Sequence, residues 1–260
     1  MRDAPPLTPQ GWDDWFANQA TWTGAARGWM YERVGLARAQ AVLDVGCGTG
    51  ALLDDLPRSQ GGLVVGLDVS WELLAFAARR HGGVSFARGD AHGLPFGPGA
   101  FDVVLCHFVL LWLERPRQAL EEMVRVVRPG GWVVACAEPD YGGRIDHPPE
   151  LAPLGEMQRE ALRRQGADPE MGRRLAGLFA GAGLQVTVGT LAGQWQRPAA
   201  PGEAFEAEWR MRAWDLGDAI APDELARLKE ADRQAMERGE RVLFVPTFYA
   251  LGQKGGLSGR

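Results

Sequence analysis

From residue 41 onward the chain alternates between short apolar runs and longer amphipathic stretches. The apolar runs are rich in Val and Leu at successive positions, as expected for strands that are buried on both faces of a parallel sheet. The stretches between them repeat apolar residues every three or four positions, which is the spacing of a helix with one buried face. This alternation predicts a doubly wound α/β fold with helices on both faces of the sheet. The predicted strands cover residues 41–45, 63–68, 84–89, 101–108, 132–137, 184–190 and 241–251.

Local signals place the helices between these strands. Ser70 can cap a helix that stops at a Gly-Gly pair, and Pro116 can open one that ends before a Pro-Gly-Gly turn. Asp168 and the proline after it open a further helix that ends near residue 181. The leucines at 52, 53 and 56 also predict a helix directly after residue 50.

Three stretches depart from the alternation. Residues 1–40 contain four tryptophans and predict a helical arm, which aromatic packing would hold on the main domain; an aromatic role beside a bound cation is the alternative. Residues 141–167 are polar and leave the carboxyl end of a central strand, where open α/β sheets bind ligands. Residues 200–239 are helical again. We therefore expect a single domain, 1–260, with a ligand-binding core at 41–140 and two cap insertions.

The segment at 41–50 is the most informative, because a buried strand leads into a loop with glycine at positions 46, 48 and 50. Glycine tolerates positive φ and lets a ligand approach the backbone. The loop also satisfies the dinucleotide fingerprint, which would place a pyrophosphate at this turn. Asp44 opposes that interpretation, since its carboxylate would repel a pyrophosphate but would suit a ligand with an ammonium and a sulfonium group.

Residues 42–50 resemble motif I of the class I S-adenosylmethionine-dependent methyltransferases, and four later segments are similar to the same family in the same order. They are residues 66–70, 88–96, 101–104 and 125–131. The resemblance implies S-adenosyl-L-methionine as cofactor and S-adenosyl-L-homocysteine as product. It also implies a Rossmann-like, mainly parallel seven-stranded sheet, whose last strand inserts antiparallel between the fifth and sixth, with helical cap segments.

The strand ends supply the expected cofactor contacts. Asp68 would bind the ribose hydroxyls, although a strand-end Asp can also cap the next helix. Asp90 would accept from the adenine amino group, with a simple turn as the alternative. The complete expected set is Asp44, Gly46, Cys47, Gly48, Asp68, Val69, Asp90, Ala91 and His107.

Methyl transfer from a sulfonium is a single displacement, for which positioning alone can supply about 7–11 kcal/mol. A general base would add to this. His107, at the end of the fourth strand, and Tyr141 are the candidate catalytic residues, with His147 as a competitor and a backbone contact as the plainer role of His107. We expect no metal; a cluster of Asp140, Asp146 and His147 is the alternative.

Net charge and composition restrict the classes of binding partner that we expect. The chain has 28 Lys and Arg against 33 Asp and Glu, a net charge of −5, which argues against a nucleic-acid partner and favours a small-molecule acceptor. No apolar run is long enough to predict a membrane span, and three scattered cysteines fit a reducing cytoplasm. The oligomeric state is not indicated. A non-catalytic S-adenosylmethionine-binding module and an NAD(P)-dependent oxidoreductase are the alternatives to a methyltransferase.

Overall fold

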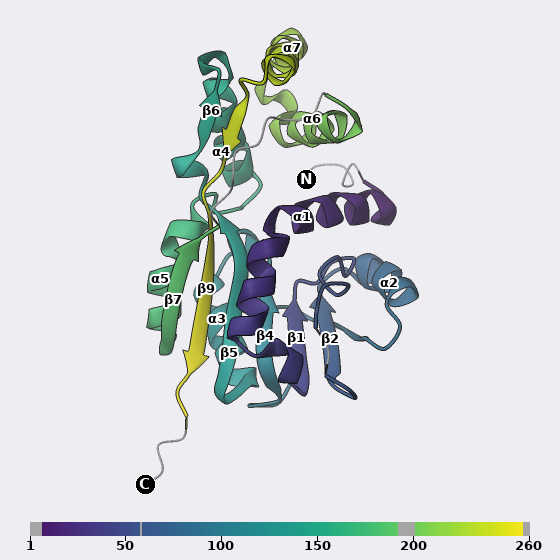
Figure 1. Cartoon of the computed structure of the whole chain (residues 1–260), viewed down its shortest axis with the longest axis vertical. Coiled ribbons are helices and arrows are strands. Elements are labelled where there is room, and N and C mark those ends of the chain that lie inside the picture. Colours follow the sequence, from purple (N-terminus) through teal and green to yellow (C-terminus); the bar gives the residue numbers. More distant parts are fainter. Residues whose placement is uncertain (1–6, 58, 192–200, 257–260) are drawn as a thin grey trace.

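A computed structural model describes residues 7–57, 59–191 and 201–256 (Figure 1). Residues 1–6 of the predicted arm and residue 200 of the second predicted cap lie outside this range. The chain forms a seven-stranded sheet with the order β3-β2-β1-β4-β5-β9-β7. Its strands are β1 (Ala41–Val45), β2 (Leu63–Asp68), β3 (Ser85–Arg88), β4 (Phe101–Cys106), β5 (Val127–Pro139), β7 (Leu184–Thr190) and β9 (Thr247–Lys254).

The strand directions confirm the predicted topology. The first five strands in the order β3-β2-β1-β4-β5 pair in parallel, and β9 lies antiparallel between β5 and β7. Helices α2 (Trp71–Arg80), α3 (Pro116–Val126) and α5 (Met171–Gly181) connect the strands, and Ser70 caps α2 by accepting from the backbone of Leu73. The short helices η1 (Leu36–Arg38) and η2 (Leu110–Trp112) lie before β1 and after β4.

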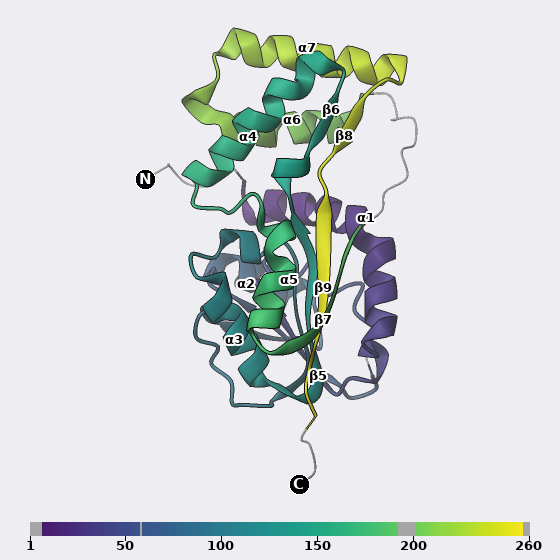
Figure 2. The same cartoon turned by 90° about the vertical axis from the view of Figure 1, so that its left-hand side faces the viewer.

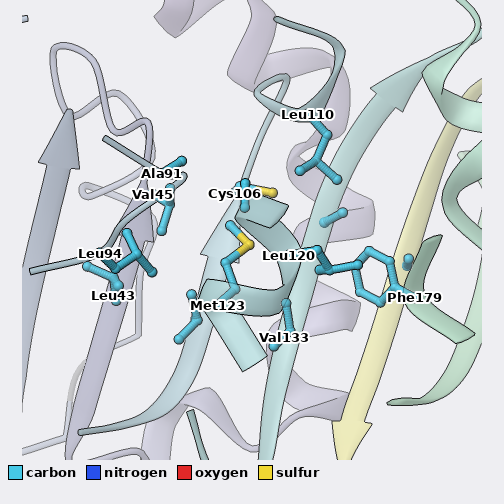
Figure 3. Packing of buried hydrophobic residues seen from close by; sticks show 14 of the residues in the cluster. Leu43, Val45, Ala91, Leu94, Cys106, Leu110, Leu120, Met123, Val133 and Phe179 are labelled. Carbon is cyan, nitrogen blue, oxygen red and sulfur yellow. The ribbon is translucent and has the colours of Figure 1, made fainter. Parts of the chain in front are cut away.

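The sheet is buried on both faces, which explains the unbroken apolar runs. Leu43 of β1 joins a core with α3 and α5, whose side chains are drawn in Figure 3. Val42, the preceding residue, points to the opposite face and joins a second core with Met30 and Tyr31 of helix α1 (Pro9–Arg33). Successive strand residues point to opposite faces, so each of these two residues needs an apolar side chain.

Helix α1 has two parts that run in different directions (Figure 1). Its first part lies across the carboxyl ends of β1 and β2, and its second part runs down one face of the sheet. The Ala20 carbonyl accepts from Arg27 Nη1 at 2.6 Å and from Thr23 Oγ1 at 3.3 Å. Side chains that insert into the helical hydrogen-bond ladder in this way bend helices. The bend brings the arm over the ligand end of the sheet.

A cap stands beyond the carboxyl ends of the strands (Figures 1 and 2). It combines residues from both predicted insertions and has its own apolar core, which includes Leu154, Phe205, Trp209 and Leu228. Strand β6 (Ile145–His147) pairs antiparallel with β8 (Val242–Phe244) inside it. Its helices are η3 (Tyr141–Gly143), η4 (Pro149–Leu151), α4 (Ala152–Arg164), α6 (Glu203–Leu216), η5 (Gly217–Ala219) and α7 (Pro222–Arg238).

Two predictions of local structure are wrong. Residues 51–55 form turns instead of a helix, because only residues 51–56 separate the positive-φ Gly50 from Pro57, too few for a stable helix. The predicted strand at 241–251 is divided into two strands, β8 and β9, with Pro246 between them. This proline has no N–H for a sheet ladder, and the chain changes partners there from β6 to β5 and β7.

The remaining boundaries shift by a few residues. β5 starts at Val127 and not at 132, since Val127 pairs with Phe101 ahead of a register shift. The helix that Asp168 was expected to open begins at Met171, and the Asp168 side chain instead accepts from the backbone of Glu170. Within the described ranges, no helix combines the length and apolar character that a bilayer span requires.

Candidate cofactor site

The loop after β1 has the backbone that its glycines predict. Gly46, Gly48 and Gly50 have φ values of +71°, +53° and +84°. A Cβ on Gly46 would lie 2.5 Å from Val109 Cγ2, and one on Gly48 would lie 3.0 Å from Phe16 Cε2. Both positive φ and close neighbours therefore require glycine, and the arm and the loop after β4 enclose motif I from two sides.

Asp44 is the most unusual residue of the site. Its carboxylate is 1% exposed, and its Oδ2 has no hydrogen-bond partner within the described part of the chain. Burial, with Asp68 nearby, raises the pKa of Asp44 to about 8, and Arg27 opposes this shift. Thr49 Oγ1 is likewise buried without a partner among the described residues. Unpaired buried polar atoms are costly, so these two fit a ligand that brings its own donors, such as an ammonium group.

Asp68 connects the end of β2 to motif I. Its Oδ2 accepts from Gly48 N at 2.9 Å, and its Oδ1 accepts from Ser70 N at 2.8 Å. A carboxylate has about four lone-pair sites, so two ribose hydroxyls can still bind there. Val69 follows directly and is 61% exposed, with an apolar edge that a base can contact. Burial raises the pKa of the Cys47 thiol in the same loop, so it remains neutral.

Asp90 lies at the exposed end of β3. Its Oδ1 accepts from His92 N at 2.9 Å and lies 2.7 Å from His92 Nδ1, and these bonds lower the pKa of Asp90. This is the local turn that was the alternative to an adenine contact. Ala91, between the two residues, is buried. The turn leaves the second carboxylate oxygen for a ligand, and the adenine contact remains a prediction.

His107 lies after β4, with its Nε2 2.9 Å from Thr23 Oγ1 on α1. The Thr23 hydroxyl accepts a hydrogen bond from Arg27 Nη1. It can donate its own proton either to Ala20 O at 3.3 Å or to His107 Nε2 at 2.9 Å, and the imidazole is the nearer acceptor. Burial, with help from Arg27, lowers the pKa of His107 to about 3. The ring is therefore neutral at pH 7 and its Nε2 accepts from Thr23, an arrangement that suits an anchor for the arm better than a general base.

Arg27 was not among the predicted site residues. Its guanidinium is 1% exposed, donates to Ala20 O at 2.6 Å and forms an ion pair with Asp55. Its Nε is buried without a partner in the described chain. A fully buried Arg that lowers the pKa values of Asp44 and His107 is part of the site's electrostatics. The only sequence signal was that Arg27 is the single charged residue between positions 22 and 31 of the arm.

Glu138, at the end of β5, was also missed. Its buried Oε1 accepts from Val109 N at 3.0 Å and Leu110 N at 2.8 Å, and its Oε2 accepts from Leu111 N at 3.1 Å. Burial raises its pKa to about 8, and the three N–H bonds act in the opposite direction. They hold the loop after β4, in which Phe108 has an uncommon positive φ of +53°. Glu138 thus positions the loop that encloses motif I.

Tyr141 and the acids near it belong to the base of the cap. Tyr141 is partly buried, and burial raises the pKa of its phenol, which stays protonated at neutral pH. Asp140 receives two bonds of 2.7 Å from Arg173, and Asp146 receives two of 2.8 Å from Arg144. The acids of the alternative metal cluster are engaged otherwise: the carboxylates of Asp140 and Asp146 pair with arginines, and across the described ranges no three His, Cys, Asp or Glu residues form a group that could hold a metal.

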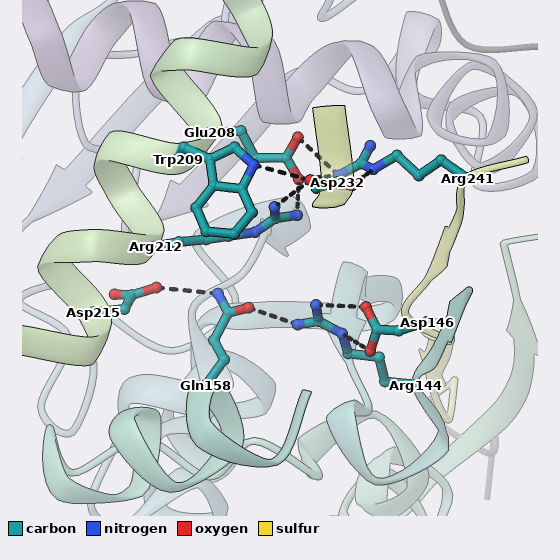
Figure 4. Close-up of polar contacts among 9 residues, drawn as sticks. All are labelled: Arg144, Asp146, Gln158, Glu208, Trp209, Arg212, Asp215, Asp232 and Arg241. Atoms are coloured by element: carbon teal, nitrogen blue, oxygen red, sulfur yellow. Dashed lines mark hydrogen bonds and ion pairs between the residues drawn. The ribbon is translucent and has the colours of Figure 1, made fainter. Parts of the chain in front are cut away.

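A second buried polar cluster lies inside the cap (Figure 4). Asp232 accepts from Trp209 Nε1 at 2.9 Å and from Arg212 Nη1 at 3.0 Å, and its other oxygen accepts from Arg241 Nε at 2.5 Å. Gln158 links Arg144 to Asp215 through bonds of 2.6 and 3.1 Å. These residues come from α4, α6, α7 and the positions directly before strands β6 and β8, so the network holds the cap together.

A glycine loop after β1, strand-end acids and the observed strand order together specify the fold family. Residues 43–135 match the family described as Methyltransferase domain. Residues 43–135 therefore form a methyltransferase domain, in agreement with the resemblance of this segment to the class I S-adenosylmethionine-dependent methyltransferases. The methyltransferase domain thus covers β1 to most of β5, and the nicotinamide-dependent alternative finds no support in this match.

Two relatives show how far the similarity extends. The demethylmenaquinone methyltransferase of Renibacterium salmoninarum is 39% identical over 125 residues, which is 46% of this chain and 52% of that protein. An uncharacterized methyltransferase of Schizosaccharomyces pombe is 32% identical over 180 residues, 64% of each chain. The chain thus spans about half to two thirds of the length of these relatives.

Solved structures agree on the fold. The YcgJ protein of Bacillus subtilis superposes with a TM-score of 0.56 over 88% of this chain and 97% of that protein, at 18% identity. An identity this low supports the Rossmann-like fold alone. The family match covers the strands that carry the cofactor site, and the cap lies outside this match.

Proposed function

We propose that this chain transfers a methyl group from S-adenosylmethionine to a small-molecule acceptor. The observation that carries the proposal is the buried Asp44 Oδ2 beside the glycine loop, which has no partner among the residues that the structure describes and could receive a cationic head group. When bound, S-adenosylmethionine supplies a methyl group that is activated by its sulfonium. The family match and the demethylmenaquinone methyltransferase relative support a small acceptor.

The residues present fit this cofactor. Asp44 would receive its ammonium group, and the nearby Arg27 places a positive charge where a carboxylate of the same head group is favoured. Asp68 would bind the ribose. The backbone of the motif I loop would follow the ligand, and the remaining base contacts would come from the residues predicted for them: Val69, Asp90 and Ala91.

The protein's contribution to the reaction would be alignment and exclusion of water. The arm covers the carboxyl ends of β1 and β2, and Phe16 contacts the motif I loop. His107 would hold the arm in place through Thr23. Tyr141, a neutral phenol, can hydrogen-bond an acceptor at the base of the cap. Positioning of this kind can supply about 7–11 kcal/mol without a general base.

Titration calorimetry with S-adenosylmethionine and S-adenosylhomocysteine tests the first part of the proposal. Both ligands should bind a folded sample; binding of neither would refute the proposal. A screen of small acceptors for release of S-adenosylhomocysteine tests the second part. Cofactor binding without turnover on any acceptor class would favour the non-catalytic binding module instead.

A further inference from the structure

A chain of aromatic rings connects motif I to the cap. Phe16 of α1 lies on the loop, with Cε2 3.0 Å from the position of a Cβ on Gly48. Trp12 stacks on Phe16 with ring centroids 5.3 Å apart and planes at 24°. Trp214 of α6 meets Trp12 edge-on at 6.4 Å and 85°. All three rings are only partly buried, so part of their surface is accessible to a ligand.

Helix α6 has two apolar faces, and the cap core uses only one of them. Phe205, Trp209 and Leu216 are buried in that core and share one side of the helix. Trp214 follows Trp209 by five residues, which at 3.6 residues per turn places it about 140° around the axis. It therefore points away from the cap core, and its ring contact with Trp12 shows that this second face meets the arm.

The charged residues next to Trp214 are engaged inside the cap. Arg212 pairs with Glu208 and Asp232, and Asp215 accepts from Gln158 (Figure 4). Their charges are thus compensated by cap residues. The contact between the arm and α6 presents aromatic surface, and a ligand there would be recognised by ring stacking and burial of apolar area.

We propose that Trp12, Phe16 and Trp214 bind the acceptor, and that the acceptor is a flat, apolar ring system with its own nucleophilic atom. An acceptor must reach the cofactor, and this ring chain runs without a break from the motif I loop to the cap. A flat molecule that lies against it has one end at the cofactor site. This inference rests on the proposed methyltransferase function and names the substrate class for it.

The test uses 2-naphthol as a flat, apolar probe and ethanolamine as a polar one, each added to the complex with S-adenosylhomocysteine and followed by saturation-transfer NMR. The wild-type complex should bind 2-naphthol and not ethanolamine. Trp214→Leu and Trp12→Leu should each weaken 2-naphthol binding at least fivefold, because leucine removes the stacking surface. Trp22→Leu is the matched control on the same helix, since Trp22 is 57% exposed and its ring partner is Trp15.

The affinity for S-adenosylhomocysteine separates the possible failures. Trp214→Leu should keep it within about twofold, which also shows that the variant is folded. If Trp12→Leu does not fold, Trp214→Leu decides the test alone. Absence of 2-naphthol binding by a wild type that binds S-adenosylhomocysteine would overturn the acceptor class, as would an equal loss in Trp22→Leu or no loss in Trp214→Leu. A wild type that does not bind S-adenosylhomocysteine would overturn the proposed function itself.

Discussion

The two buried polar clusters of this molecule differ in how well they are satisfied. In the cap, Asp232 is 1% exposed, and both its oxygens accept bonds from Trp209, Arg212 and Arg241. At motif I, Asp44 is equally buried, yet its Oδ2 has no partner among the residues that the structure describes.

This difference indicates that the cap cluster has a structural role and that Asp44 belongs to a ligand site. A buried network whose members are all paired fixes the packing of the elements that contribute to it. A buried acid without a partner carries a desolvation cost that the fold alone does not repay, and such groups mark sites where a ligand completes the bonding. Replacement of the acid by its amide should therefore lower stability in the cap cluster and lower ligand affinity at motif I.

The largest effect should come from the cap. Asp232→Asn removes the buried charge that pairs with the buried Arg212 and the partly buried Arg241, so we expect the free energy of unfolding to fall by about 3 kcal/mol, as when one member of a buried ion pair is lost. Denaturant unfolding measures this loss. The affinity for S-adenosylhomocysteine should stay within about twofold. Asp223→Asn, an exposed site on the same helix, should cost under about 1 kcal/mol, and an equal loss there would contradict the assignment.

Asp44→Asn should show the reverse pattern. At pH 7 the carboxyl is largely protonated in the folded free protein but ionised in the unfolded chain, so its replacement by an amide should not lower the free energy of unfolding. Binding of S-adenosylhomocysteine should weaken by about 1.5–3 kcal/mol, or roughly 10- to 150-fold, through loss of a charge-assisted bond. Calorimetry measures this change, with the exposed Asp14→Asn as control. An unchanged dissociation constant would remove Asp44 from the site.

The pH dependence sharpens the same contrast. The pKa of Asp44 is about 8 in the folded free protein and 3.8 at its ordinary value, so the folded state binds the extra proton between these limits. The stability from this proton is complete below pH 4 and is lost as the pH rises to 8. A bound ammonium would favour the carboxylate, so binding near pH 6.5 should release about one proton. Calorimetry in buffers of different ionisation enthalpy counts it. Asp44→Asn should release none, and an equal release there would contradict this origin.

The smallest effect concerns the arm. Thr23→Val and His107→Leu each remove the bond between α1 and the loop after β4, worth about 1 kcal/mol, so chymotrypsin should cut the arm roughly fivefold faster. His107→Gln can still accept from Thr23 and should behave like wild type. With an acceptor in hand, a hundredfold loss of turnover in His107→Gln at unchanged affinity for S-adenosylhomocysteine would instead establish His107 as the base.

The cofactor half of this fold could be predicted because its signals are local. The strand that carries Asp44 and the glycines after it lie in one short segment, and Asp68 and Asp90 each follow a strand directly. Parallel strands bring such ends to one edge of the sheet, so adjacency along the chain becomes adjacency in space.

The site residues that the sequence did not predict depend on contacts that no local pattern encodes. Thr23 and His107 are 84 positions apart and meet only because α1 bends over the sheet. Arg27 becomes a site residue through the same bend, while Glu138 depends on the path of the loop after β4. The same holds for the cap, where Trp214 of α6 contacts Trp12 of α1 although the two helices are far apart in the sequence.

The position of β9 has a consequence for how this protein is made. Residues 247–254 form a strand that hydrogen-bonds to β5 on one side and β7 on the other. On the ribosome, β5 and β7 emerge before β9 and then expose unpaired edges, which invite pairing with other chains. The five parallel strands can pair without β9, but completion of the sheet must wait until this segment has been translated. A nascent chain stalled before residue 247 would retain an open sheet and become a substrate for chaperones or proteases.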